Sequence, residues 1–94
     1  MKQENLIIAS NKLQRSIYTI LMKSGVTSPE IDECIYWAFG KGAWVLSPYP
    51  DWMNRWNKLH PQVKVKGKDS FVEFMYVVGT LFLLDKQKKQ FKSN

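Results

Sequence analysis

The chain has little of several features that small proteins use for stability or targeting. It contains one cysteine and one histidine in 94 residues, so it cannot form an internal disulfide, and a disulfide-stapled secreted scaffold is excluded. These two residues also cannot supply a tetrahedral zinc site of Cys and His ligands. The apolar run Leu6–Ala9 is too short for a signal peptide, and the best hydrophobic stretch, Phe74–Leu84, has about half the length of a membrane span. We therefore expect a cytoplasmic protein, in a bacterium or inside a host cell, with no membrane partner.

The chain also lacks the motifs of common catalytic sites. It has no His-Glu-x-x-His and no Cys-x-x-Cys, and the segment 40–42 (Gly-Lys-Gly) is too short for a phosphate-binding loop. Three of its eight acidic residues, Glu30, Asp32 and Glu33, crowd the start of one predicted helix. There they favour the positive end of the helix dipole more than acid–base catalysis. We therefore expect no enzymatic activity, no cofactor and no metal.

Two single residues have both a structural and a functional interpretation. Cys34 lies on an apolar stripe between Ile31 and Ile35, which predicts a small core residue and leaves a reactive thiol as the alternative. His60 precedes Pro61 at a predicted helix end. It is expected to face the helix dipole as a cation, with pH sensing or phosphate contact as the alternative.

The chain is rich in hydrophobic residues and carries a net positive charge. Hydrophobic residues make up 45% and aromatic residues 14%, which is too apolar for a disordered chain and adequate for one small core. Fourteen basic residues face eight acidic ones, for a net charge of +6. Residues 1–40 are neutral overall, and residues 41–94 carry the whole excess, with ten basic and four acidic residues. This asymmetry favours an anionic partner or, alternatively, a solubilising surface with a basic tail.

Helical periodicity predicts four helices, over about residues 5–23, 27–40, 52–59 and 71–85. Gly25 is a plausible left-handed stop for the first. Thr27 with Glu30, and Ser70 with Glu73, have the spacing of capping boxes at the second and fourth.

Gly79 interrupts the last helical pattern. A glycine there costs about 1 kcal/mol relative to alanine, and close packing against a neighbouring element would explain it. The alternative is that the helix ends at Gly79 and residues 80–84 form a strand. We favour a continuous helix, followed by a mobile basic tail over residues 86–94, with residues 1–85 as the single domain.

Two short strands are expected between these helices. Residues 43–46 (Ala-Trp-Val-Leu) are typical of a buried strand, and residues 63–66 (Val-Lys-Val-Lys) alternate strictly. Pro48 and Pro50 are expected to prevent regular structure around Tyr49. The predicted fold is mainly α with a short β hairpin or wing, an α+β class.

Aromatic and basic residues gather in the centre of the chain. Trp44, Trp52 and Trp56 lie within thirteen residues and are followed by four lysines. Such rings can stack on unpaired bases while lysines hold phosphates, can anchor a protein interface, or can close a small core. We expect Trp52, in the first turn of its helix, to be the most exposed.

These residues form two candidate sites. The candidate protein interface consists of Tyr49, Trp52, Arg55, Trp56 and Lys58. The candidate nucleic-acid site consists of Lys64, Lys66, Lys68, Lys86, Lys88 and Lys89.

The segment 28–46, a capped helix followed by glycines and a predicted strand, together with the basic strand 63–66, resembles a winged helix-turn-helix domain. That resemblance implies a compact winged-helix-like domain whose basic wing meets the DNA backbone. The helix in the reading position carries Glu30, Asp32 and Glu33, which repel phosphate. We therefore do not expect ordinary major-groove readout.

A second resemblance covers more of the chain. Residues 15–21, 26–31 and 71–86 are similar in layout to the small winged-helix-like middle components of bacterial ABC three-component systems, and the ending Leu-Phe-Leu-Leu-Asp-Lys matches best. This resemblance implies a non-catalytic subunit that bridges larger partners in defence against foreign DNA.

The leading hypothesis is a small adaptor subunit of a nucleoprotein or defence assembly, with a larger protein partner and nucleic-acid contact through the basic strand and tail. Two alternatives stay open: a stand-alone winged-helix DNA-binding regulator, and a phage or mobile-element inhibitor that blocks a host machine. The partner, the type of nucleic acid and the oligomeric state are left open by the sequence.

Overall fold

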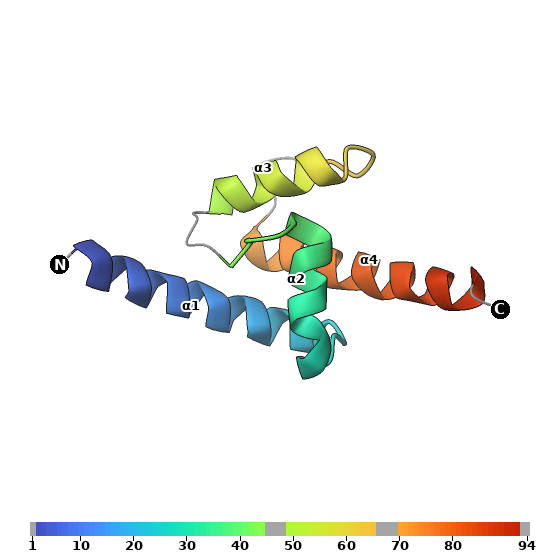
Figure 1. Cartoon of the computed structure of the whole chain (residues 1–94), viewed down its shortest axis with the longest axis horizontal. Helices are drawn as coiled ribbons and strands as arrows, with labels where there is room; N and C mark the ends of the chain where they lie inside the picture. Colours follow the sequence, from blue (N-terminus) through green and yellow to red (C-terminus); the bar gives the residue numbers. More distant parts are fainter. Residues whose placement is uncertain (1, 45–48, 66–69, 93–94) are drawn as a thin grey trace.

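The computed structural model describes the backbone of residues 2–44, 49–65 and 70–92, and the side chains of residues 12–44, 51–65 and 70–90. The elements are α1 (Lys2–Lys23), the 3₁₀ turn η1 (Ser28–Glu30), α2 (Ile31–Phe39), α3 (Tyr49–Leu59) and α4 (Phe71–Lys92). The long helices α1 and α4 extend beyond α2 and α3 at opposite ends of the molecule (Figure 1). None of the helices described here combines the length and hydrophobicity that crossing a bilayer requires.

The end of α1 is a Schellman motif. The Val26 N–H donates to the carbonyl of Leu21 at 3.0 Å, and the Gly25 N–H donates to the carbonyl of Met22 at 3.1 Å. Gly25 has a φ of +103°, which a glycine adopts without steric cost. Leu21 and Val26 are both buried, so the turn also directs the chain back onto the core. The predicted stop at Gly25 is confirmed.

A capping box begins the next helical segment. The Thr27 N–H donates to Oε1 of Glu30 at 3.2 Å, in the capping-box arrangement that the spacing predicted. The first turn is the 3₁₀ turn η1, and α2 follows it. Gly40, with a φ of +88°, ends α2 and donates its N–H to the carbonyl of Tyr36.

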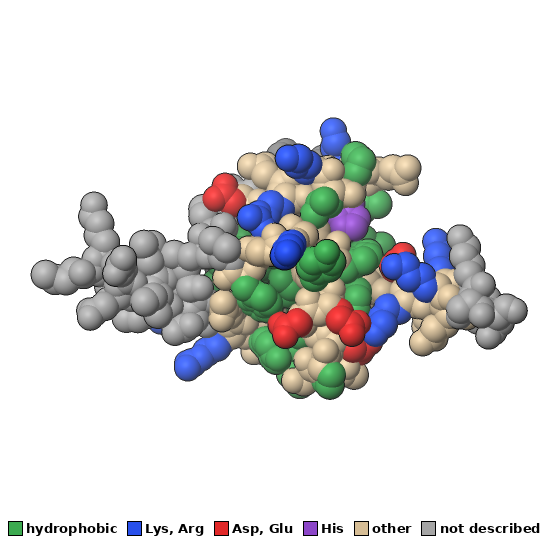
Figure 2. All heavy atoms as spheres, in the orientation of Figure 1, with side chains coloured by type: hydrophobic (Ala, Val, Ile, Leu, Met, Phe, Trp, Pro, Cys, Tyr) green, Lys and Arg blue, Asp and Glu red, His purple; other side chains and the backbone are tan. Residues whose placement is uncertain are grey.

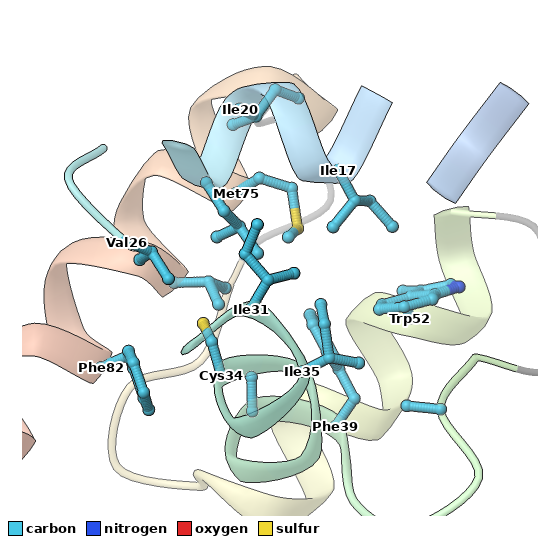
Figure 3. Packing of buried hydrophobic residues seen from close by; sticks show 14 of the residues in the cluster. Ile17, Ile20, Val26, Ile31, Cys34, Ile35, Phe39, Trp52, Met75 and Phe82 are labelled. Atoms are coloured by element: carbon cyan, nitrogen blue, oxygen red, sulfur yellow. The ribbon is translucent and has the colours of Figure 1, made fainter. Parts of the chain in front are cut away.

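The core lies where α2 crosses the other three helices. Figure 3 shows Ile31, Ile35 and Phe39 of α2 pointing toward side chains of the neighbouring helices, among them Ile17 of α1 and Trp52 of α3. The buried core residues are Ile17, Ile20, Leu21, Val26, Ile31, Cys34, Ile35, Ala38, Phe39, Ala43, Trp52, Trp56, Phe74, Met75, Val78 and Phe82. Since this cluster draws on all four helices, it fixes the position of each one.

The helix α4 runs unbroken through Gly79, as predicted. A β-carbon at position 79 would lie 2.9 Å from Cβ of Ser24 and 3.3 Å from Cδ2 of Leu21, so α1 and α4 approach too closely for a side chain. The Ser70 hydroxyl accepts a hydrogen bond from the Glu73 N–H at 3.2 Å, which caps the start of α4.

The prediction of an α+β winged-helix fold is wrong, because the described residues are helical or irregular and contain no strand. Residues 41–44 form turns, residues 63–65 are not a strand, and the remainder of both predicted strands lies outside the described residues.

Side chains of α3 form hydrogen bonds with the backbone of the segment that follows it. The carbonyl of Val63 accepts a hydrogen bond from Nε1 of Trp56 at 2.7 Å. Val65 donates its N–H to Oδ1 of Asn57 at 2.8 Å, and its carbonyl accepts from Nδ2 of Asn57 at 3.3 Å. Since buried or half-buried backbone groups need a partner, these side chains replace the neighbouring strand that a wing would require.

Two smaller expectations are also corrected. Pro50 is the second residue of α3, where its missing N–H leaves no helical hydrogen bond unmade. The last helix does not end near Asp85, because α4 continues to Lys92. Residues 86–92 therefore extend the helix, where a separate basic tail was expected.

Candidate protein-binding groove

The two tryptophans of α3 are part of the core. Trp52 is 2% exposed and Trp56 is 0% exposed. Trp56 stacks on His60 with ring centroids 4.1 Å apart and meets the ring of Phe74 edge-on at 5.9 Å. Trp52 meets Phe39 edge-on at 4.4 Å. The expectation that Trp52 is exposed is wrong, and neither ring can contribute to an outer contact surface.

The rest of the predicted interface is divided. Arg55 is half-buried and Lys58 is exposed, while the side chain of Tyr49 lies outside the described residues. Trp44 is half-buried, and its Nε1 donates to Oδ1 of Asp32 at 3.1 Å. A binding role for these residues stays a prediction.

The predicted nucleic-acid lysines that the structure describes lie on two segments, and two of them are paired with carboxylates. Lys64 is exposed on the segment after α3, and Lys88 is exposed on α4. Lys89 pairs with Asp85 at 3.3 Å, and Lys86 pairs with two carboxylates of the η1–α2 region. Lys66 and Lys68 lie outside the described residues. Contact of these lysines with phosphate stays a prediction, and the two pairs reduce the charge available for it.

The ion pair between Lys86 and Glu30 joins α4 to the start of α2. The Lys86 ammonium lies 2.5 Å from Oε2 of Glu30 and 3.4 Å from Oε2 of Glu33. The hydrogen bond from Lys86, together with those from Thr27, lowers the pKa of Glu30 to about 2. The same hydrogen bond to Glu30 raises the pKa of Lys86 above 10.5. Both residues are therefore charged near neutral pH and hold α4 beside α2.

Cys34 lies in the core, and His60 packs against aromatic rings. Burial, with a smaller contribution from the charge of Glu30, raises the pKa of the Cys34 thiol to about 12. The ring of His60 stacks on that of Trp56, with ring centroids 4.1 Å apart. It also lies 4.9 Å from the Trp37 ring, with Nε2 3.3 Å from the Trp37 carbonyl. No cluster of three or more His, Cys, Asp or Glu side chains able to hold a metal ion occurs in the described part of the chain.

The outer side of α2 carries an exposed aromatic residue beside a groove. Tyr36 is 63% exposed, more than any other large hydrophobic side chain among the described residues. Beside it a groove of about 610 Å³ runs between α2, the end of α3 and the second half of α4. Its apolar lining includes Trp37, Leu59 and Phe82, and its charged lining consists of Glu33, Lys41, Asp85, Lys86 and Lys89.

A second hollow lies on the other side of Tyr36. It measures about 510 Å³ and includes Trp44 and Asp32 in its lining. Tyr36 and Glu33 line both hollows, so the tyrosine separates two adjoining depressions. We call the surface formed by Tyr36, Trp37, Trp44 and Leu59 the Tyr36 surface. Figure 2 shows hydrophobic side chains over α2 and toward α3, with acidic and basic side chains beside them.

Sequence reasoning missed this surface because it followed the density of tryptophans. The buried residues of α2 are Ile31, Cys34, Ile35, Ala38 and Phe39, and Tyr36 and Trp37 are not among them. A residue outside the buried stripe of an amphipathic helix is expected to face solvent. The position of Tyr36 relative to that stripe was therefore the available signal. No family model, curated protein or solved structure matches the chain.

Proposed function

We propose that this protein is a small non-enzymatic binding subunit that docks on a larger protein through the Tyr36 surface. The observation that carries the proposal is the 63% exposure of Tyr36, which lines both the groove that contains Trp37 and Leu59 and the hollow that contains Trp44. Tyrosine and tryptophan are enriched among the residues that dominate binding energy at protein interfaces. The proposal keeps the expected class of function and moves the contact surface from α3 to α2.

The charges around the groove support a protein partner over a nucleic acid. Glu33 and Asp85 line the groove together with three lysines, and Asp32 lines the second hollow. A phosphate backbone would meet these carboxylates, two of which already pair with the lysines Lys86 and Lys89. A polar rim with both signs of charge around an apolar centre is typical of protein–protein interfaces.

The test compares two exposed tyrosines. The full chain with an affinity tag is expressed in its native cells, and bound proteins are quantified by mass spectrometry for the wild type, Tyr36→Ala and Tyr18→Ala. Tyr18 is 36% exposed on α1 and is the matched control. The affinity of the purified complex is then measured by calorimetry.

Tyr36→Ala is expected to weaken binding by roughly 2 kcal/mol, about thirtyfold, and Tyr18→Ala to leave it unchanged. The free energy of unfolding of Tyr36→Ala should stay within about 0.5 kcal/mol of the wild type, because an exposed side chain contributes little to the core. Equal recovery of a partner by both variants, or no partner for the wild type, would overturn the proposal.

A further inference from the structure

The outer face of α4 carries an unpartnered pattern of two charged and two apolar residues. Glu73, Val77, Leu84 and Lys88 follow one another at spacings of four, seven and four residues. At 3.6 residues per turn these four positions fall within an arc of about 60° on the helix. The buried residues Phe74, Met75, Val78 and Phe82 lie on the other side of α4.

This outer face is exposed over its whole length. Val77 is 45% exposed and Leu84 is 48% exposed, and Glu73 and Lys88 are also exposed. Neither charged group forms an ion pair with another described residue. By contrast, Lys86 and Lys89 on neighbouring turns of the same helix are both paired. The outer charges therefore remain available to a partner.

Two copies of this face are complementary when the helices run in opposite directions. In two antiparallel copies of α4, a two-fold axis between Thr80 and Leu81 places Glu73 of one copy opposite Lys88 of the other. The same axis places Val77 opposite Leu84. A two-fold interface uses the same patch on both subunits, so each contact occurs twice. A parallel pair in register would instead place Glu73 opposite Glu73 and Lys88 opposite Lys88, which repel.

We propose that the outer face of α4 binds a second copy of this chain, with the two α4 helices antiparallel. Charge complementarity favours a second copy as the partner. In the antiparallel arrangement, the acidic group of one copy faces the basic group of the other, and the two apolar side chains face each other. The proposal does not depend on the Tyr36 surface. Since α2 packs on the inner side of α4, such a dimer would leave both Tyr36 surfaces accessible and could join two partner molecules.

The first test uses two leucines of nearly equal exposure on different surfaces. The mass of the full chain is measured by sedimentation velocity from micromolar to millimolar concentration at low salt. Leu84→Lys is compared with Leu59→Lys, since Leu59 is 49% exposed and lines the Tyr36 groove. Leu84→Lys should raise the dimer dissociation constant on the order of 100-fold, because two apolar contacts are lost per dimer. Leu59→Lys should leave dimer formation unchanged.

The two leucines also separate the two proposals. Leu59→Lys is expected to lose partner binding and keep the dimer, which would support the Tyr36 surface. Leu84→Lys is expected to lose the dimer, which would support the α4 interface. A wild type that stays monomeric throughout, or a dimer that Leu84→Lys does not weaken, would overturn the antiparallel dimer. Neither result would bear on the Tyr36 surface.

A charge exchange tests the antiparallel order and does not depend on the leucine variants. Glu73→Lys alone places two lysines at each end of the dimer, and Lys88→Glu alone places two glutamates there. Each variant should weaken self-association by about tenfold at low salt. An equimolar mixture should recover the wild-type affinity, because each lysine at position 73 then faces a glutamate at position 88 and each lysine at position 88 faces a glutamate at position 73. Failure of the mixture to recover would overturn the antiparallel arrangement.

Discussion

The helices α2 and α3 pack against each other and both carry large aromatic residues, but only α2 exposes one of its aromatic side chains among the described residues. On α3, Trp52 and Trp56 are four residues apart and lie on the buried side. On α2, Phe39 is buried, whereas Tyr36 and Trp37 lie outside the buried stripe, so Tyr36 faces solvent and Trp37 is half-buried. The position of a residue relative to the apolar stripe of its helix therefore decides its exposure. Residue type and neighbouring charge do not.

The largest expected effect on stability comes from replacing Trp56, a buried tryptophan of α3. Trp56→Ala removes a fully buried ring together with its stacking on His60 and its hydrogen bond to the Val63 carbonyl. We expect the free energy of unfolding to fall by about 3–5 kcal/mol, measured by urea denaturation. Tyr36→Ala is the control from the exposed side of α2. If Trp56→Ala lowered the free energy of unfolding by less than 1 kcal/mol and abolished partner binding, the contact surface would lie on α3 and not at Tyr36.

A milder pair of substitutions separates the two buried tryptophans. Nε1 of Trp56 donates to the Val63 carbonyl at 2.7 Å, whereas Nε1 of Trp52 is buried without a hydrogen-bond partner in the described part of the chain. Trp56→Phe should therefore cost about 1 kcal/mol more than Trp52→Phe, since only Trp56→Phe removes a hydrogen bond. Urea denaturation of the two variants gives the difference. Equal losses would show that the hydrogen bond contributes nothing to fixing the segment after α3.

The smallest expected effect concerns charge on the outer side of the α2–α4 contact. The pKa of Glu30 is lowered from 4.5 to about 2 by its hydrogen bonds with Lys86 and Thr27. Its stabilising contribution is therefore fully present above about pH 4.5 and is lost as the pH falls toward 2. The raised pKa of Lys86 acts at the alkaline end, where its contribution is lost as the pH rises beyond 10.5.

The measurement follows the free energy of unfolding of the wild type and Glu30→Gln from neutral pH to pH 2. The difference between them should shrink as the pH falls, because the wild type then loses the charge that the variant never had. Glu33→Gln is the matched control, since Glu33 is 3.4 Å from the same ammonium and more exposed. A difference that stays constant with pH would show that Glu30 acts by packing.

The helices could be predicted from the sequence because their signals are local. The stop at Gly25, the cap at Thr27 and the cap at Ser70 each depend on residues within a few positions, and all three occur in the structure. Gly79 likewise indicated a close approach, although its partner Ser24 could not be named.

The failures involve side-chain contacts between elements, which a local pattern does not show. The alternation of residues 63–66 is typical of a strand, but Asn57 and Trp56 supply the hydrogen bonds that a second strand would have made. The pairing of Lys86 joins residues 56 positions apart. Tyr36 was the exception, because the stripe of α2 already placed it outside the core.

The reactivity of the buried Cys34 thiol can be used to measure how often α2 separates from the core. Thiolate, not thiol, reacts with disulfide reagents, and a pKa of about 12 together with complete burial keeps Cys34 unreactive while α2 is docked. Because it is the single cysteine of the chain, any labelling reports on one helix. In the regime where reclosing is faster than labelling, the labelling rate is proportional to the population of the open form. Without any engineered probe, the rate would show how often α2, the helix that carries Tyr36, leaves the core.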